Sequence, residues 1–334
     1  MTVCYLIQTY KNPEQIYRLV RLIQRTSSDC FIVVSHNFDS CWLNTIDLQK
    51  FKNVKVIQNN GVMMGSFSII QGLFDAIDWL LSKKIKFDWL INITGQDYPT
   101  QPLYKIENFL QTTDYDGFIE YFDVHSQQNP WSRNIANTRY LYNYKHSQRY
   151  TLPWQRLMLK PIKHIINNCQ PFVRLHYSYG ISVGVKSCVK LFNNNFICYG
   201  GSYFATISRK CVTYLHNFLK QNPCVLDYYK KTFIPEESLM QTVLVNSKKF
   251  NLYNGNFRYM DFTNSRYGHP RILTNKDFSV MTKENIHFAR KFDIKEDSGI
   301  LDKLDQRIFT DRSINIPLAE FVTGHNHSIQ SVKT

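Results

Sequence analysis

The residues best suited to chemistry form short acidic and basic motifs. Pro235-Glu-Glu-Ser238 places a proline and two carboxylates where a helix is expected to begin. Proline suits the first helical position, and adjacent helical residues point about 100° apart, so only one acid can address a substrate. The motif is the best candidate for a general base. Two acids that only complement the helix dipole would give the same pattern.

Two basic motifs lie late in the chain, His269-Pro-Arg271 and His287-Phe-Ala-Arg-Lys-Phe-Asp293. In the second, Arg290 and Lys291 lie between two phenylalanines, which can fix the segment to a core while the cations project. Arginine binds phosphate oxygens in pairs and lysine acts as a point charge, so the two sites could bind a diphosphate. A basic surface strand or turn remains the alternative.

Two further acidic motifs follow or precede expected strands. Gly95-Gln-Asp-Tyr-Pro99 directly follows an apolar strand, where an α/β sheet places functional groups, although it also fits an ordinary turn. Asp114-Tyr-Asp116 matches the DxD pair by which many nucleotide-sugar transferases hold Mg²⁺ or Mn²⁺. The pair precedes its strand and so lies at the wrong end of the sheet. A solvated turn is favoured, and the metal site is kept as an alternative.

The elements that would position these motifs alternate between strand and helix. Apolar runs predict strands at residues 4–9, 31–35, 54–57, 88–94 and 117–122. Asn12 and Ser66 are expected to cap two helices with apolar residues at helical spacing. This alternation predicts parallel βαβ units, whose ligands bind at the carboxyl ends of the strands.

The later chain is less regular at first. Residues 126–196 are rich in Tyr, Arg, Asn and Trp with weak periodicity, and predict an irregular insertion. A strand at 200–207, a helix at 209–220 and a helix from Pro235 follow. With no repeat or flexible linker between them, these parts predict one catalytic domain.

The amino-acid composition excludes some classes of protein and indicates the kind of partner. The chain has 334 residues, 43% of them hydrophobic, which excludes a disordered chain, and a net charge of +14, which indicates an anionic partner. There is neither a P-loop nor a GxGxxG motif, and no CxxC pair for zinc. Nucleic acid is disfavoured as the partner because no recognised binding motif and no long basic run occurs.

Taken in order, the motifs resemble the core-2/I-branching β-1,6-N-acetylglucosaminyltransferase and peptide O-xylosyltransferase family, glycosyltransferase family 14. The resemblance runs from about residue 5 to residue 308. Its markers are Thr9-Tyr-Lys-Asn-Pro-Glu-Gln15, Gly65-Ser-Phe-Ser68, Trp89-Leu-Ile-Asn-Ile-Thr-Gly-Gln-Asp-Tyr-Pro99, Gly201-Ser-Tyr-Phe204, Pro235-Glu-Glu-Ser-Leu-Met-Gln-Thr242 and Phe288-Ala-Arg-Lys-Phe-Asp293.

The resemblance implies a GT-A-like nucleotide-sugar fold, an α/β domain with a mixed, mostly parallel central sheet flanked by helices. The expected catalytic domain is 1–293, with a nucleotide-binding half at 1–125 and an acceptor half at 126–293, followed by a C-terminal extension at 294–334. The implied reaction is an inverting transfer of GlcNAc or xylose from a UDP-sugar to a hydroxyl of a glycan, glycolipid or peptide. No metal or other cofactor is expected, because basic residues take the place of the metal at the diphosphate.

The family's motifs also imply roles for individual residues. Glu237 matches the catalytic glutamate, although the chain reads Pro-Glu-Glu where the family reads Pro-Asp-Glu. Lys291 and, more loosely, Arg271 match the diphosphate cations, with Arg290 beside them. The expected nucleotide contacts are Thr9, Lys11, His36, Gly65, Ser66, Gly95 and Asp97, and the expected acceptor contacts are Trp131, Arg133, Gly201, Ser202 and Glu236.

The expected location follows from an absence in the sequence. Animal members of the family are anchored by an N-terminal membrane helix, and this sequence has no apolar run of the required length. The prediction is therefore a cytoplasmic enzyme that acts on surface-polysaccharide or lipid-linked acceptors. The excess of cations predicts peripheral contact with the inner, anionic face of the membrane.

Overall fold

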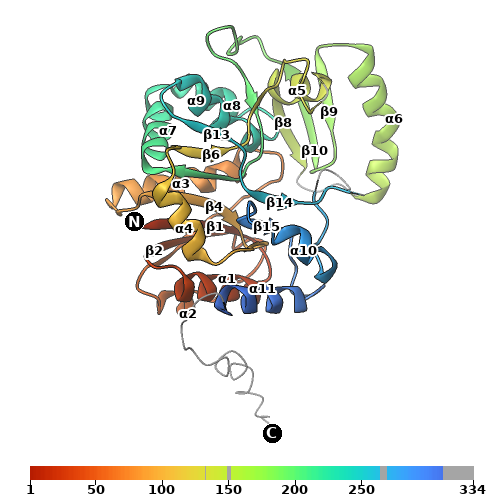
Figure 1. Cartoon of the computed structure of the whole chain (residues 1–334). Helices are drawn as coiled ribbons and strands as arrows, with labels where there is room; N and C mark the ends of the chain where they lie inside the picture. Colours follow the sequence, from red (N-terminus) through yellow and green to blue (C-terminus); the bar gives the residue numbers. More distant parts are fainter. Residues whose placement is uncertain (132, 149–151, 264–268, 311–334) are drawn as a thin grey trace.

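A seven-stranded sheet forms the centre of the computed structural model, which describes residues 1–131, 133–148, 152–263 and 269–310 (Figure 1). The strand order is β13-β6-β12-β4-β1-β2-β3. The strands are β1 (Val3–Thr9), β2 (Cys30–His36), β3 (Val54–Gln58), β4 (Trp89–Thr94), β6 (Gly117–Ile119), β12 (Ala205–Ser208) and β13 (Leu252–Asn254).

Most of the pairings in this sheet are parallel. β1 pairs in parallel with β2 and β4, β2 with β3, and β13 with β6. β12 is antiparallel to both of its neighbours, β4 and β6. β6 therefore runs in the same direction as β4. The predicted mixed, mostly parallel sheet is confirmed.

Side chains alternate between two cores along β1, because successive residues of a strand point to opposite faces. Val3, Tyr5 and Ile7 are fully buried on the face covered by α1, α4 and α11. Cys4 and Leu6 are buried on the face covered by α3, α7 and α9. The helices are α1 (Pro13–Thr26), α3 (Ser68–Ser82), α4 (Leu103–Thr112), α7 (Arg209–Gln221), α9 (Leu239–Ser247) and α11 (Gly299–Thr310). The predicted arrangement of helices on both faces of the sheet is confirmed.

α11 belongs to the first of these cores. Its residues Ile300, Leu301, Leu304 and Ile308 are buried in the same cluster as the side chains of β1. The expected boundary at residue 293 therefore does not coincide with a break in the core, at least as far as residue 310.

The middle of the chain is more regular than its sequence indicated. It contains α5 (Arg133–Tyr140), α6 (Pro153–Cys169) and a three-stranded sheet of order β8-β10-β9, made of β8 (Tyr142–Gln148), β9 (Val173–His176) and β10 (Ile181–Lys186). The prediction of an irregular insertion was wrong, because polar and aromatic residues mask the alternation in an antiparallel sheet whose two faces are both only partly apolar. We refer to residues 133–186 as the α6 subdomain, which lies beside the main sheet in Figure 1.

Short elements complete the fold. A three-stranded sheet joins β14 (Arg258–Met260), β15 (Phe288–Arg290) and β5 (Asp97–Pro99), and a two-stranded one joins β11 (Tyr199–Gly200) and β7 (Phe122–Asp123). The remaining helices are α2 (Ile46–Gln49), α8 (Pro223–Tyr229), α10 (Phe278–Met281), and the 3₁₀ turns η1 (Pro235–Glu237) and η2 (Asn275–Asp277).

Two predicted helix caps differ in the structure. α3 begins two residues after Ser66, whose hydroxyl donates to the Met63 carbonyl at 2.8 Å. Asn12 does precede α1, but its side chain donates to Asp293 instead of capping the helix. Among the described residues, no helix combines the length and the apolar character that crossing a membrane requires.

Candidate active site

A cleft of about 530 Å³ lies at the carboxyl ends of the parallel strands, and we call it the strand-end cleft. Thr9 of β1, Ser35 of β2 and Thr94 of β4 line it. Parallel strands that end together leave backbone groups and polar side chains at one edge of the sheet, which is where α/β folds bind ligands. The cleft is therefore in the place that the strand–helix alternation predicted.

Arg290 brings a fixed cation into this cleft. β15 pairs with β5 so that Arg290 lies opposite Asp97, and the Arg290 Nε is 3.3 Å from the Asp97 Oδ1. The guanidinium carbon is 4.2 Å from the ring centre of Phe204, which also lines the cleft. Asp97 is buried, and burial raises its pKa, while the charge of Arg290 opposes that rise. The guanidinium therefore lies between a buried carboxylate and an aromatic ring.

Lys291 adds a second cation to the cleft. Burial lowers its pKa first, and the nearby charges of Lys11 and Arg290 lower it further, while Asp293 opposes them. An anion bound nearby would stabilise the charged form of Lys291, because its negative charge would offset both the cost of burial and the repulsion from the other cations. The wall formed by Arg290 and Lys291 can therefore bind an anionic group such as a diphosphate.

The acidic turn η1 lies in the wall of the same cleft. Ser238 ends the turn, with φ −146°, and its hydroxyl donates to the Tyr199 carbonyl at 2.7 Å. The two acids therefore lie in a 3₁₀ turn before α9, and the prediction that they occupy the first turn of an α-helix was wrong. The 3₁₀ turn leaves the Glu237 side chain 35% exposed, while Glu236 is buried.

Glu237 is held by an arginine that the sequence did not indicate as part of the site. The Arg139 Nη1 donates to the Glu237 Oε2 at 2.6 Å, and its guanidinium carbon is 4.4 Å from the ring centre of Trp131. Burial lowers the pKa of Arg139, but Glu237 and, after it, Tyr140 raise that pKa, and the net shift is upward. Arg139 is 98 residues from Glu237 in the sequence, so no local pattern could reveal the pair.

Glu236 has a different environment from its neighbour. Burial, and secondarily the charge of Glu237, raise its pKa to about 8. Its Oε2 is buried and has no hydrogen-bond partner among the residues that the structure describes. A carboxyl group with this pKa is mostly protonated at neutral pH and can donate a hydrogen bond.

A second hollow of about 440 Å³, the side cleft, adjoins the first. The side chains common to both are Met64, Ser178, Tyr179, Glu236, Glu237 and His269. The side cleft continues over the α6 subdomain, where Lys163, Arg174 and His176 line it. Glu237 therefore lies between two hollows that can hold two different molecules.

The structure brings part of the predicted set together. The strand-end cleft is lined by Glu237, Glu236, Arg290, Lys291 and Thr9, and the side cleft by Gly65. His269 was not among the predicted site residues, but it lines both clefts.

Arg271 does not line either cleft. It pairs with the carboxylates of Asp261 and Asp277, at 2.6 and 2.5 Å. Both carboxylates raise its pKa, chiefly through the hydrogen bond with Asp277. The looser match of Arg271 to the family motif therefore lacks support from the geometry, and its diphosphate role stays a prediction.

Several predicted nucleotide contacts are structural neighbours of the strand-end cleft instead of lining it. The His36 ring is buried, with Nδ1 2.7 Å from the Thr9 hydroxyl and Nε2 2.8 Å from the Cys41 carbonyl. The Lys11 ammonium pairs with Asp293 at 2.8 Å. Ser66, Gly95 and Asp97 likewise position backbone and side chains behind the wall of the cleft.

The predicted acceptor residues support the acidic turn from behind. Gly201 N–H donates to the Glu237 carbonyl at 2.9 Å, and an added Cβ at Gly201 would lie 1.9 Å from the Glu120 carbonyl oxygen. The Ser202 carbonyl accepts from the Gln241 amide, and Trp131 stacks on Arg139. The side chain of Arg133 lies outside the described residues.

The alternative metal pair is far from this arrangement in the topology. Asp114 and Asp116 precede β6, which runs parallel to β4, so they lie at the opposite end of the sheet from the strand-end cleft. Asp116 accepts from the Asn251 N–H and pairs with Lys210 at 3.4 Å. Among the described residues, no cluster of three metal-type side chains occurs.

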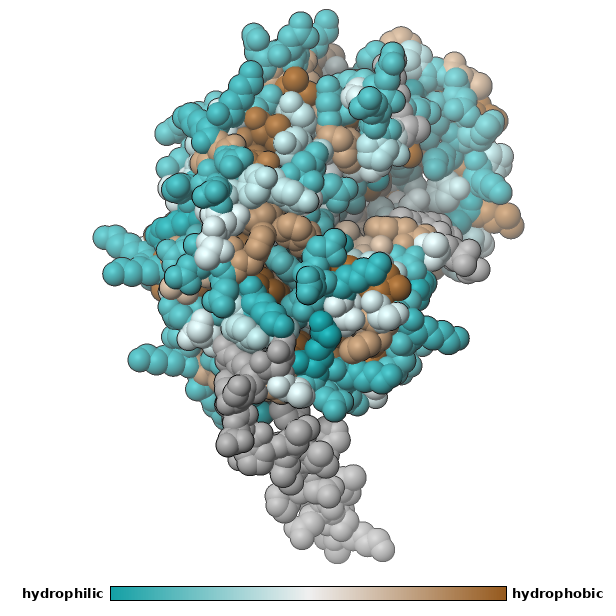
Figure 2. Space-filling model, viewed as in Figure 1, coloured by the Kyte–Doolittle hydropathy of each residue, from teal (hydrophilic) through white to brown (hydrophobic). Residues whose placement is uncertain are grey.

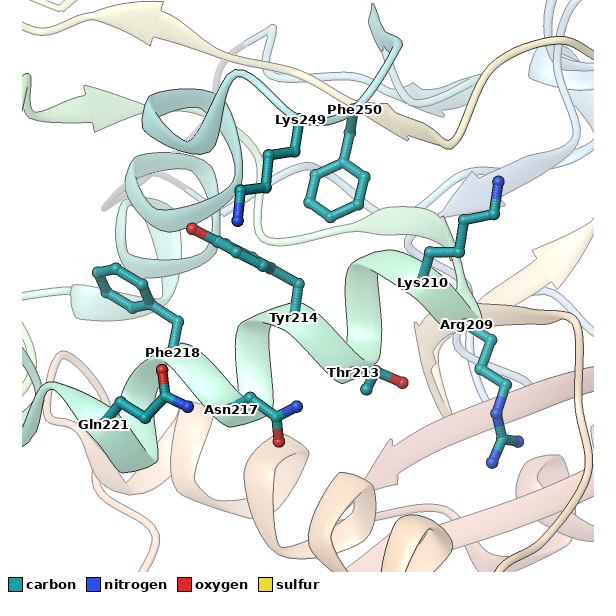
Figure 3. A pocket seen from close by; sticks show the side chains of 9 residues that line it. All are labelled: Arg209, Lys210, Thr213, Tyr214, Asn217, Phe218, Gln221, Lys249 and Phe250. Carbon is teal, nitrogen blue, oxygen red and sulfur yellow. The ribbon is translucent and has the colours of Figure 1, made fainter.

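A separate surface groove of about 710 Å³ lies along α7 (Figure 3). Tyr214 and Phe250 form part of it, with the Lys249 Nζ 5.1 Å from the Tyr214 ring centre. Among the described residues, its lining contains no carboxylate that could act as a base. The groove therefore does not compete with the strand-end cleft as an active site.

Known proteins with similar sequences transfer sugars. Beta-glucuronosyltransferase GlcAT14B of Arabidopsis thaliana is 27% identical over 264 residues, which is 78% of this chain and 53% of that protein. Xylosyltransferase oxt of Drosophila pseudoobscura pseudoobscura is 21% identical over 323 residues, which is 88% of this chain and 32% of that protein. The chain thus spans about half the length of the first relative and about a third of the second.

Similarity to solved structures is low. S. aureus TarS in complex with UDP-GlcNAc matches with a TM-score of 0.26 and 17% identity, over 40% of this chain and 38% of that one. A putative glucose-1-phosphate thymidylyltransferase from Bacillus anthracis matches with a TM-score of 0.32 and 11% identity, over 75% and 85%. The family comparison covers far more, because the sequence model of the Core-2/I-branching enzyme matches residues 3–287. The chain therefore belongs to the Core-2/I-branching enzyme family.

Proposed function

We propose that this protein is an inverting, metal-independent glycosyltransferase that moves a sugar from a UDP-sugar to an acceptor hydroxyl. The observation that carries the proposal is the position of Glu237. Its carboxylate lies between the strand-end cleft, whose wall contains Arg290 and Lys291, and the side cleft. A base between a donor site and an acceptor site is what direct displacement at a sugar carbon requires.

The donor occupies the strand-end cleft in this proposal. Negative charge develops on the diphosphate as the bond to the sugar breaks. Arg290, held by Asp97 and Phe204, and Lys291 are cations already in place for that charge. One well-placed donor of this kind stabilises a transition state by about 3–4 kcal/mol. Two such cations can therefore perform the role of a divalent metal at the leaving group.

The acceptor hydroxyl approaches Glu237 from the side cleft. A hydroxyl does not ionise at neutral pH, and a carboxylate that accepts its proton contributes roughly 10²–10⁴-fold to the rate. The bond from Arg139 to the Glu237 Oε2, at 2.6 Å, fixes the orientation of the carboxylate, and in this proposal Oε1 accepts the proton. Attack from the face opposite the diphosphate inverts the α-linkage to β.

The donor sugar is proposed from the class of the relatives. Their names specify glucuronosyl and xylosyl transfer, and the motifs of the chain resemble GlcNAc transferases as well. We therefore propose UDP-GlcNAc, UDP-xylose or UDP-glucuronic acid as the donor, and a glycan, glycolipid or peptide as the acceptor. Hydrolysis and thermal stabilisation measured with each of the three UDP-sugars will identify the donor.

The central test is the variant Glu237→Gln, which keeps the size of the side chain and removes its basicity. Transfer should fall by roughly 10²–10⁴-fold, while the affinity for UDP, measured by calorimetry, should change little. Glu284→Gln, at an exposed position, is the matched control and should keep full activity. Unchanged turnover in Glu237→Gln would exclude Glu237 as the base.

Metal independence is tested separately. Activity should persist in EDTA, and the double variant Asp114→Asn with Asp116→Asn should remain active. A full loss of activity in EDTA that Mn²⁺ restores, together with an inactive double variant, would instead favour a metal-dependent transferase that uses this pair.

A further inference from the structure

The α6 subdomain presents an unusual surface. α6 has no fully buried residue. Gln155, Leu159, Lys163, Ile166 and Asn167 are half-buried and recur at helical spacing, so they mark the face that packs on the protein. The Asn167 amide fixes this face by pairing with both backbone groups of Leu175 in β9, at 2.8 and 3.1 Å.

The opposite face of α6 is apolar and exposed. Its side chains recur every three or four residues, which makes one continuous stripe along the helix. The exposed fractions are 59% for Trp154, 75% for Leu157, 61% for Met158, 44% for Ile162 and 59% for Ile165. We call these five side chains the α6 stripe. Figure 2 shows hydrophobic residues at the edge of the molecule where Figure 1 places α6.

Positive charge is concentrated in the part of the sequence that contains this stripe. Residues 124–226 contain thirteen Lys and Arg and neither Asp nor Glu, so the other 231 residues have 27 of the 40 cations against all 26 acids. Almost the whole net charge of +14 therefore belongs to the segment that contains α6. Lys160 and His164 are exposed on α6 itself, next to the stripe.

We propose that α6 is an interfacial helix that docks the protein onto a bilayer containing anionic lipids, with the α6 stripe inserted among the acyl chains. A helix with one apolar face, a basic polar face and no acid binds in the plane of such a surface. At 17 residues with exposed cations, α6 lies on the bilayer and does not cross it. Charge complementarity selects the anionic bilayer over an uncharged apolar partner.

Docking would place the clefts close to the lipid surface. Arg156 of α6 lines the strand-end cleft, and Lys163 and Asn167 line the side cleft. The inward face of the helix thus forms part of the site while the outward face contacts lipid. The inference concerns a surface other than the catalytic groups, so its failure would leave the proposed transfer reaction intact.

The test is flotation of the whole chain with vesicles of phosphatidylcholine, alone or mixed with phosphatidylglycerol. The protein should float with the mixed vesicles and much less with phosphatidylcholine alone. The double variant Leu157→Gln/Ile165→Gln should bind the mixed vesicles at least about tenfold more weakly, because each side chain contributes of the order of a tenfold factor when buried. Removing Lys160 with Lys160→Gln should weaken binding about fivefold.

The matched control is Trp42→Gln/Ile46→Gln, which removes two apolar side chains that are 78% and 65% exposed and belong to the segment at and just before α2 instead of α6. This control pair should bind vesicles as the wild type does, and all variants should melt at the wild-type temperature because the altered side chains are exposed.

Three results would overturn the proposal. The first is no flotation of the wild type, and the second is equal weakening by the control pair and the α6 pair. The third is a dimer, seen by light scattering, that Leu157→Gln/Ile165→Gln converts to a monomer without any vesicle binding, because the stripe would then be an interface between copies of the chain.

Discussion

Replacing Glu236 by glutamine should make the stability of the protein less dependent on pH. The pKa of Glu236 is raised from its ordinary value of 4.5 to about 8, first by burial and then by Glu237. The folded protein therefore binds one more proton than the unfolded chain between these pH values. The stabilising contribution of this proton is fully present below pH 4.5 and is lost as the pH rises through 8.

The size of the effect follows from the linkage between protons and folding. One extra bound proton changes the free energy of unfolding by about 1.4 kcal/mol per pH unit. Between about pH 5.5 and about pH 7 the wild type should lose roughly 2 kcal/mol through this group. Glutamine does not titrate, so the difference between Glu236→Gln and the wild type should grow by that amount.

Urea unfolding followed by tryptophan fluorescence, at a series of pH values, measures this difference. The contributions of the other carboxylates to the pH dependence of stability cancel when the two proteins are compared. Glu284→Gln, at an exposed position, is the matched control. The slope should persist in a Glu237→Gln background, because burial is the larger cause of the shift. Parallel stability curves for Glu236→Gln and the wild type would contradict a raised pKa for Glu236.

Two other substitutions separate contacts in the cleft from contacts behind it. Lys291→Ala should lower the rate of transfer by about 10²–10³-fold and weaken UDP binding. Arg271→Ala should leave the rate and UDP binding unchanged and only lower the melting temperature, because Arg271 pairs with two carboxylates outside the clefts. A weaker affinity for UDP in Arg271→Ala would restore the role that the family motif implies. Gly201→Ala should destabilise the protein by about 1–3 kcal/mol and reduce activity, because the new Cβ meets the Glu120 backbone. A wild-type melting temperature in Gly201→Ala would contradict this.

The first half of the main sheet could be predicted from the sequence because its information is local. β1, β2 and β4 are short apolar runs, and α1 repeats its apolar residues at helical spacing. Each element therefore shows its own period, and the alternation of strand and helix implies parallel pairing. The location of the strand-end cleft follows from that pairing alone.

The α6 subdomain could not be predicted in the same way. The exposed face of β10 includes Val183 and Val185, and α6 turns its apolar stripe away from the protein. A pattern read on the assumption that apolar residues face a core gives the wrong faces here. The segment therefore appeared irregular although its backbone is regular.

The candidate site was predicted where a motif contains its own partners, and missed where the partners are distant. Arg290 and Lys291 follow directly from their motif, since Arg290 ends β15 and Lys291 comes directly after it, and both line the cleft. The pairing of Arg139 with Glu237 joins two segments 98 residues apart. In His269-Pro-Arg271 the spacing could not show which side chain faces the cleft. Arg271 turns away from it because Arg271 pairs with Asp261 and Asp277.

The order of strands in the main sheet has a consequence for synthesis of the protein on the ribosome. β4 ends at Thr94, but its second neighbour β12 begins only at Ala205, about 110 residues later. At roughly 5–20 residues per second, one edge of β4 stays without a partner for roughly 5–20 s after it has been made. Unpaired strand edges are templates for aggregation. The intervening segment, which includes α6, therefore sets how long the nascent chain needs the protection of a chaperone.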